Sequence, residues 1–137
     1  MDEQERIAKA LDYHHAGYNC AQSTVLAVAD LAGLAPDEAY RLLEGFGGGM
    51  GGFSETCGAI SGAVAAVSYA KSGGLGNPIT KRATYELSKE MVDRFRVKNG
   101  STRCPALKGL EGEPAPHPCD DYVADGVALA YDLLTRK

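Results

Sequence analysis

Apolar residues recur at helical spacing in every long segment of this chain. Near the N-terminus, Ile7, Ala10 and Leu11 fall at intervals of three and four, and Leu87 and Met91 repeat the pattern further along. This spacing places the apolar side chains on one face of a helix. No strictly alternating pattern, which would indicate a β-strand, continues for more than a few residues. The hydrophobic pattern therefore predicts an all-α fold.

Start and stop signals divide the chain into about five or six helices. Asn19 and Pro36 are typical of helix starts, whereas Gly17 and Gly33 are typical of helix ends. The predicted helices span residues 2–15, 19–32, 36–44, 55–72, 79–98 and 119 onward, with a brief turn containing Cys104. Because 137 residues with 45% hydrophobic content suit one core, we expect residues 1–137 to form a single-domain bundle.

The segment Glu55–Ser72 is rich in small residues. Gly58, Ala59, Gly62 and Ala63 recur at helical spacing, and this makes a smooth face against which another helix can pack closely. Glycine inside a helix costs up to about 1 kcal/mol relative to alanine, so a packing role is expected for Gly58 and Gly62. We predict that this is the central, most buried helix.

A glycine-rich loop precedes this helix and leads to a cysteine. Residues 47–52 contain five glycines, a density that permits positive φ angles and close approach of the backbone. Ser54 is a predicted N-cap, which would put Cys57 near the third position of the helix. The partial positive charge of a helix N-terminus favours thiolate over thiol. Cys57 is therefore the expected nucleophile, and Glu55 a local base.

The other three cysteines share this kind of placement. Cys20 and Cys119 lie at predicted helix starts, and Cys104 lies in or beside a short turn. No pair has the C-x-x-C spacing of a thioredoxin-like dithiol or half a zinc site. If the cysteines act together, the fold must assemble them from distant segments. The loops around the third helix allow the starts at Cys20 and Cys57 to face one another, so we predict that these two share one site, with Cys104 and Cys119 approaching it.

Two chemistries fit such a site. In the first, a thiolate attacks a disulfide, persulfide or oxidant, and a second cysteine resolves the mixed species. In the second, the thiolates of Cys20, Cys57, Cys104 and Cys119 bind zinc or an iron–sulfur cluster in a non-catalytic protein. The number of cysteines favours metal binding, whereas their wide separation in the sequence does not.

The residues around Cys57 carry a family resemblance. Cys57-Gly58-Ala59-Ile60-Ser61-Gly62 matches a C-G-A-x-x-G motif, and Cys20, Cys104 and Cys119 follow the expected order. With these features the chain resembles, over nearly its whole length, the C_GCAxxG_C_C family of redox-active proteins with four characteristic cysteines. The resemblance implies a thiol-dependent oxidoreductase that uses Cys57, Cys20, Cys104 and Cys119 with a redox partner or a small thiol or oxidant.

Composition and the remaining motifs narrow the alternatives. The net charge is −4, and the 14 basic residues are scattered among 18 acidic ones, which disfavours nucleic-acid binding. The N-terminus has no signal-peptide pattern and the longest apolar stretch is interrupted by serines, so we expect a cytoplasmic protein without membrane insertion. The glycine loop is not followed by the Gly-Lys-Ser/Thr of a P-loop.

The histidines are the remaining candidate ligands or acid–base groups. His14 and His15 point to different sides of a helix, so at most one of them can face a site near Cys20. His117 is expected to be a solvated loop residue.

Overall fold

The computed structural model describes residues 1–137 and confirms the all-α fold. It contains seven α-helices and two short 3₁₀ segments. One isolated β-bridge joins Thr56 and Arg103. The α-helices are α1 Glu3–His15, α2 Cys20–Ala32, α3 Pro36–Leu43, α4 Gly58–Lys71, α5 Lys81–Asn99, α6 Cys104–Leu107 and α7 Cys119–Thr135; the 3₁₀ segments are η1 Glu44–Gly49 and η2 Pro78–Thr80. No helix is both long enough and apolar enough to cross a bilayer.

Local capping explains why several predicted boundaries match. The Asn19 side chain accepts a hydrogen bond from the Gln22 backbone N–H at 2.8 Å, and the Gln22 side chain accepts one from the Asn19 N–H at 3.2 Å. This reciprocal capping box satisfies two amide groups that a helix start leaves free. Gly33 ends α2 in the left-handed conformation, with φ of 76°. The interval from Asn19 to Gly33 is therefore defined by short-range signals.

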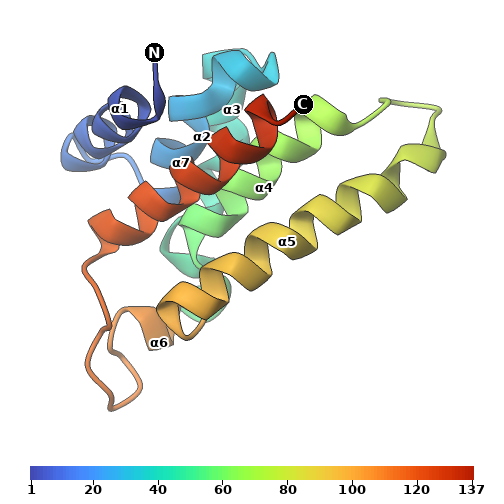
Figure 1. Ribbon diagram of the computed structural model, residues 1–137. Helices are drawn as coiled ribbons and strands as arrows, with labels where there is room; N and C mark the ends of the chain where they lie inside the picture. The colour runs from blue at the N-terminus through green and yellow to red at the C-terminus, as the bar shows by residue number, and fades with distance from the viewer.

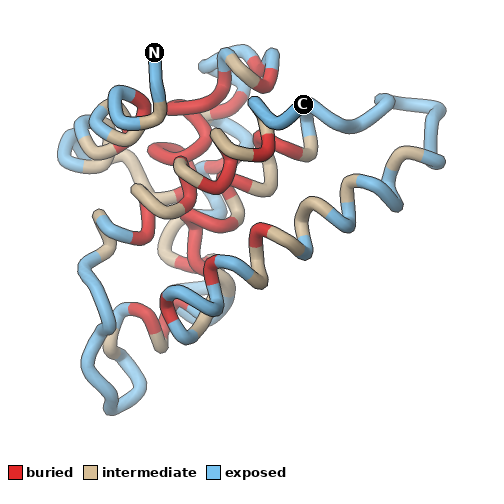
Figure 2. Tube along the Cα trace, viewed as in Figure 1, coloured by how far each residue is buried: buried red, intermediate tan, exposed pale blue.

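The core lies where α2, α4 and α7 pack together (Figure 1). Figure 2 shows most of the buried backbone in these three helices, with α1 and α3 packed around them and α5 along the outside. The small-residue helix α4 is at the centre, as predicted, but it is not the most buried helix: ten residues of α2 are buried and seven of α4. Every residue from Ala21 to Ala29 is buried, including three polar residues, Gln22, Ser23 and Thr24.

Glycines set the distances between the three central helices. A Cβ atom at Gly62 would lie 2.5 Å from the carbonyl oxygen of Ala21, and one at Gly126 would lie 2.6 Å from that of Ala59. Both distances are far below van der Waals contact, so α4 packs backbone to backbone against α2 and α7. The close approach matters for the site, because α2, α4 and α7 each begin with or directly after a cysteine.

Candidate functional site: a four-cysteine cavity

Each of the four cysteines lies at the N-terminal end of a different helix. Cys20, Cys104 and Cys119 are the first residues of α2, α6 and α7, and Cys57 immediately precedes α4. All four are free thiols. They line one cavity of about 250 Å³, which we call the four-cysteine cavity; its other lining residues are His14, Asn19, Gly48, Gly49, Phe53, Gly58, Leu107, Lys108 and Tyr122.

The start of α4 differs from the predicted one. The sequence predicts a helix from Glu55 capped by Ser54, but α4 begins at Gly58 and Cys57 is its N-cap. The reason is a long-range pairing: the Cys57 N–H donates to the Thr102 carbonyl at 2.8 Å, and the Cys104 N–H donates to the Glu55 carbonyl at 2.7 Å. Residues 55–57 therefore lie outside the helix, and Thr56 forms an isolated bridge with Arg103. The same pairing brings Cys104 beside Cys57.

Two glycines allow the cysteines to come together. A Cβ atom at Gly49, whose φ is 69°, would lie 2.2 Å from Cys104 Cβ. A Cβ atom at Gly58 would lie 3.0 Å from the Ala21 nitrogen and 3.3 Å from Cys20 Cβ. Any larger residue at Gly49 would collide with the wall of the cavity. The glycine-rich loop thus serves close packing against thiols rather than phosphate binding.

Cys57 is not the activated thiol that its position in the sequence predicted. Its side chain is 5% exposed, and burial raises its pKa to about 11, although the backbone N–H groups of Ala59 and Ile60 oppose the rise. Desolvation also raises the pKa of Cys104. The backbone N–H groups at the start of α4 do stabilise the Cys57 thiolate, but burial away from water raises the pKa by more than they lower it. The expectation of Cys57 as the low-pKa thiol is therefore wrong.

Cys119 is the cysteine whose surroundings lower its pKa. A hydrogen bond from the Cys20 thiol, and then the positive charge of Lys108, lower the pKa of Cys119 to about 6. Lys108 Nζ donates to Cys119 Sγ at 3.6 Å. The pKa of Cys20 is raised, first by its hydrogen bond to Cys119 and then by burial. Of the two thiols, Cys119 is therefore the one whose thiolate form is favoured, and both lie half-buried at the cavity.

One of the three histidines reaches the cavity. His14 Nε2 lies 3.6 Å from Cys20 Sγ, and His14 Nδ1 lies 2.7 Å from Asp120 Oδ1. His15 contacts the other oxygen of Asp120 from the exposed side. His117 packs against Tyr122 outside the cavity lining.

Sequence reasoning missed Lys108 and Asp120 as neighbours of the thiols. Their positions in the sequence could have indicated this, because Asp120 follows Cys119 directly and Lys108 lies one helical turn after Cys104. Glu55, the predicted local base, contributes its backbone carbonyl to Cys104 instead, and its side chain is exposed.

The cysteines of the cavity do not form a ready metal site. No three histidine, cysteine, aspartate or glutamate side chains converge closely enough to hold a metal ion. A structural zinc site needs four ligands at about 2.0 to 2.3 Å from one point. The cysteines surround a common space in this structure without forming that donor set.

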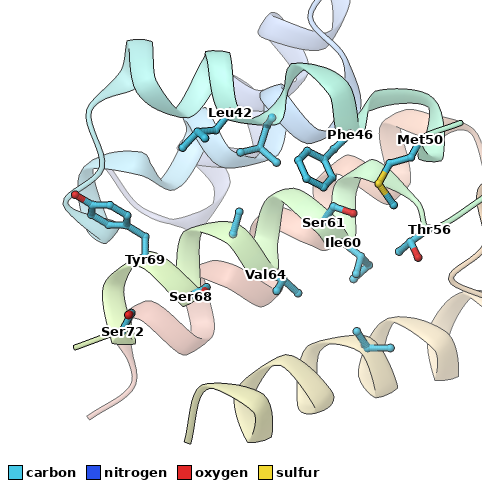
Figure 3. A pocket seen from close by; sticks show the side chains of 13 residues that line it. Leu42, Phe46, Met50, Thr56, Ile60, Ser61, Val64, Ser68, Tyr69 and Ser72 are labelled. Carbon is cyan, nitrogen blue, oxygen red and sulfur yellow. The ribbon is translucent and has the colours of Figure 1, made fainter. Parts of the chain in front are cut away.

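A second, larger cavity lies on the other side of the glycine-rich segment. This apolar groove has a volume of about 690 Å³ and runs between α3, η1, α4 and α5. Figure 3 shows one side of the groove formed by Leu42, Phe46 and Met50, and the α4 side formed by Ser61, Val64 and Ser68. Gly48 and Gly49, between Phe46 and Met50, line the four-cysteine cavity. A single short segment therefore forms a wall of both cavities.

Comparison with known proteins gives one match. A family model described as "Putative redox-active protein (C_GCAxxG_C_C)" matches residues 18–133, which include all four cysteines. No curated protein and no solved structure shows a significant match to the chain.

Proposed function

Because this chain belongs to the C_GCAxxG_C_C family, we propose that its four-cysteine cavity carries out thiol–disulfide exchange, with Cys119 as the attacking thiol and Cys20 as the resolving one. The observation that supports this assignment is the contact of Cys119 with both Lys108 and Cys20. A thiolate next to a protonated thiol is the arrangement that a two-cysteine exchange requires. Cys57 and Cys104 are both more deeply buried than this pair.

The exchange proceeds in two balanced steps. The Cys119 thiolate attacks one sulfur of a disulfide R–S–S–R, the S–S bond of R–S–S–R breaks, and one thiolate leaves. Cys20, after losing its proton, attacks Cys119 Sγ and displaces the second R–S group. The protein is then oxidised by two electrons to a Cys20–Cys119 disulfide, and the co-reactant is reduced to two thiols. A reducing partner returns the protein to the dithiol by the reverse steps.

Alkylation with iodoacetamide as a function of pH tests the assignment of the nucleophile. The thiolate is the reactive form, so wild-type protein should show one thiol whose reactivity reaches half its maximum at about pH 6. Cys119→Ser should abolish this reaction, and Cys57→Ser and Cys104→Ser are matched controls that should retain it. If Cys57→Ser loses the reaction while Cys119→Ser keeps it, the assignment is overturned.

The second step is tested with oxidised glutathione as the disulfide. Wild-type protein should lose two free thiols without retaining glutathione, whereas Cys20→Ser should stop at a mixed disulfide with a glutathione mass adduct on Cys119.

Metal analysis of protein purified without oxygen tests the alternative function, metal or iron–sulfur binding. Stoichiometric zinc or iron that is lost when any one cysteine is replaced would overturn the exchange proposal in favour of a metal-binding protein.

A further inference from the structure

Three side chains from three helices form a continuous contact at the edge of the four-cysteine cavity. His14, at the end of α1, lies between Cys20 at the start of α2 and Asp120 in the first turn of α7. The distances are 3.6 Å from Cys20 Sγ to His14 Nε2 and 2.7 Å from His14 Nδ1 to Asp120 Oδ1. The order thiol, imidazole, carboxylate is the one in which a carboxylate orients a histidine toward a nucleophile.

Asp120 decides which ring nitrogen of His14 carries the proton. An ionised carboxylate can accept but not donate a hydrogen bond, so His14 Nδ1 must be the donor in this contact. In the neutral ring the lone pair is then on Nε2, which faces the Cys20 thiol. The His14 side chain is 21% exposed. The ring is therefore held in place, yet it retains access to solvent.

The exchange needs a base at this position. Cys20 is protonated while it donates to the Cys119 thiolate, and its pKa is raised. Once Cys119 has formed a mixed disulfide, it no longer carries the charge that accepts this hydrogen bond. Cys20 must nevertheless lose its proton before it can attack. The basic atom that contacts the Cys20 sulfur from outside the thiol pair is His14 Nε2.

We propose that His14 is the general base for Cys20 in the resolving step and that Asp120 is the positioning residue that holds His14 in the accepting tautomer. The proton moves from Cys20 Sγ to His14 Nε2, and the Cys20 thiolate forms the bond to Cys119 Sγ. The bond between Cys119 and the R–S group breaks, and the imidazolium returns the proton to the departing thiolate. The products are the protein disulfide and one neutral thiol, R–SH. This inference rests on the exchange proposed above.

Other charged groups face the same region and define the controls. His15 contacts Asp120 Oδ2 at 2.7 Å, and its pKa is raised by that carboxylate and, to a lesser degree, by Asp12. Lys108 approaches Cys119 from α6's side of the cavity, and Cys57 faces Cys20 from the start of α4. Because His15 shares Asp120 with His14 but does not line the cavity, His15→Gln is the matched control.

The test separates the two steps by stopped-flow absorbance with 2,2′-dithiodipyridine, which releases one coloured thiopyridone per step. In His14→Gln the first phase should stay within about twofold of wild type, and this also shows that the site is folded. The second phase should slow by about 100-fold or more, the usual range for loss of a general base.

Two further variants complete the test. Asp120→Asn should slow the second phase less than His14→Gln does, because His14 is then no longer held in the accepting tautomer. The first phase should stay within about twofold of wild type. His15→Gln should leave both phases unchanged. If wild type shows both phases and His14→Gln leaves the second unchanged, the role of His14 is wrong while the exchange stands. If wild type does not release two thiopyridones through Cys119 and Cys20, the proposed exchange itself is wrong.

Discussion

Lys108 is the residue that holds a full positive charge next to Cys119, the proposed attacking thiol. Its Nζ atom lies 3.6 Å from Cys119 Sγ and 5.2 Å from the centre of the Phe53 ring. The aromatic face attracts the ammonium group, which keeps the lysine over the cavity. Lys108 lowers the pKa of Cys119, although less than the hydrogen bond from Cys20 does.

Lys108→Gln should raise the pKa of Cys119 because it removes a positive charge that stabilises the thiolate. The midpoint of iodoacetamide alkylation should move upward from about pH 6. It should remain below the ordinary cysteine value of about 8.5, since Cys20 still donates its hydrogen bond. Lys89→Gln is the control, because Lys89 pairs with Asp93 on the exposed side of α5. An unchanged midpoint in Lys108→Gln would show that the lysine does not tune this thiol.

Burial and neighbouring groups determine which cysteine has the lowest pKa, and neither can be read from the sequence alone. A position at a helix start was predicted for Cys20, Cys57 and Cys119, and in the structure it holds for these three and also for Cys104. The tertiary environment then separates them: Cys57 is desolvated behind the pairing with residues 102–104, whereas Cys119 has a lysine and a thiol beside it. A helix N-terminus alone is therefore a poor guide to thiol reactivity.

At the scale of elements, glycine contacts fix how closely α2, α4 and α7 approach. Gly62→Ala should destabilise the protein, although alanine is the better helix former by about 1 kcal/mol. Its Cβ atom would meet the Ala21 carbonyl oxygen at 2.5 Å, and overpacking of this kind commonly costs about 1 to 3 kcal/mol. The measurement is thermal unfolding followed by circular dichroism, with a lower Tm expected for Gly62→Ala.

Gly45→Ala provides the matched control for that substitution. Gly45 lies in η1 with nothing within 4 Å of its potential Cβ atom. This variant should keep or slightly raise the Tm, because alanine reduces the freedom of the unfolded chain. Gly62→Ala with a Tm equal to or above that of wild type would contradict the close-packing role of Gly62.

The sequence predicted those elements whose ends depend on neighbouring residues. The range 19–32 follows from the Asn19 capping box and Gly33, and both signals are local. The start of α4 was missed by a few residues because it depends on Thr102 and Cys104, which lie far along the chain. The sequence also did not indicate how completely α2 is buried. Its polar residues suggest an exposed side, yet Gln22 is buried and its side chain donates to the Tyr40 carbonyl oxygen at 3.1 Å.

At the scale of the whole molecule, the proposed reactive pair joins the two ends of the fold. Cys20 starts the second helix and Cys119 starts the last one, and α2 and α7 pack side by side. The sequence predicted that Cys119 approaches the site of Cys20, but not that these two form the closest pair, because the predicted helices alone do not specify which of them are neighbours. The segment between the pair contains most of the core.

Oxidation should therefore stabilise the protein against unfolding. A Cys20–Cys119 disulfide would close a loop of about 100 residues, for which the chain-entropy model gives about 4.7 kcal/mol at 25 °C. We expect a clearly higher Tm for the oxidised protein than for the reduced protein in differential scanning calorimetry. Cys20→Ser should show no such difference between oxidising and reducing conditions. Equal melting temperatures for the two wild-type forms would argue against a disulfide at this position.

The same loop has a reciprocal effect on the cysteines themselves. Folding, reduction and oxidation form a closed thermodynamic cycle, so the free energy that the disulfide adds to folding is the free energy that folding adds to the disulfide. The packing of α2 against α7 thus makes the folded dithiol a stronger reductant than the same two cysteines in the unfolded chain. Substitutions that loosen this packing, even far from any sulfur, should shift the reduction potential of the pair toward more oxidising values.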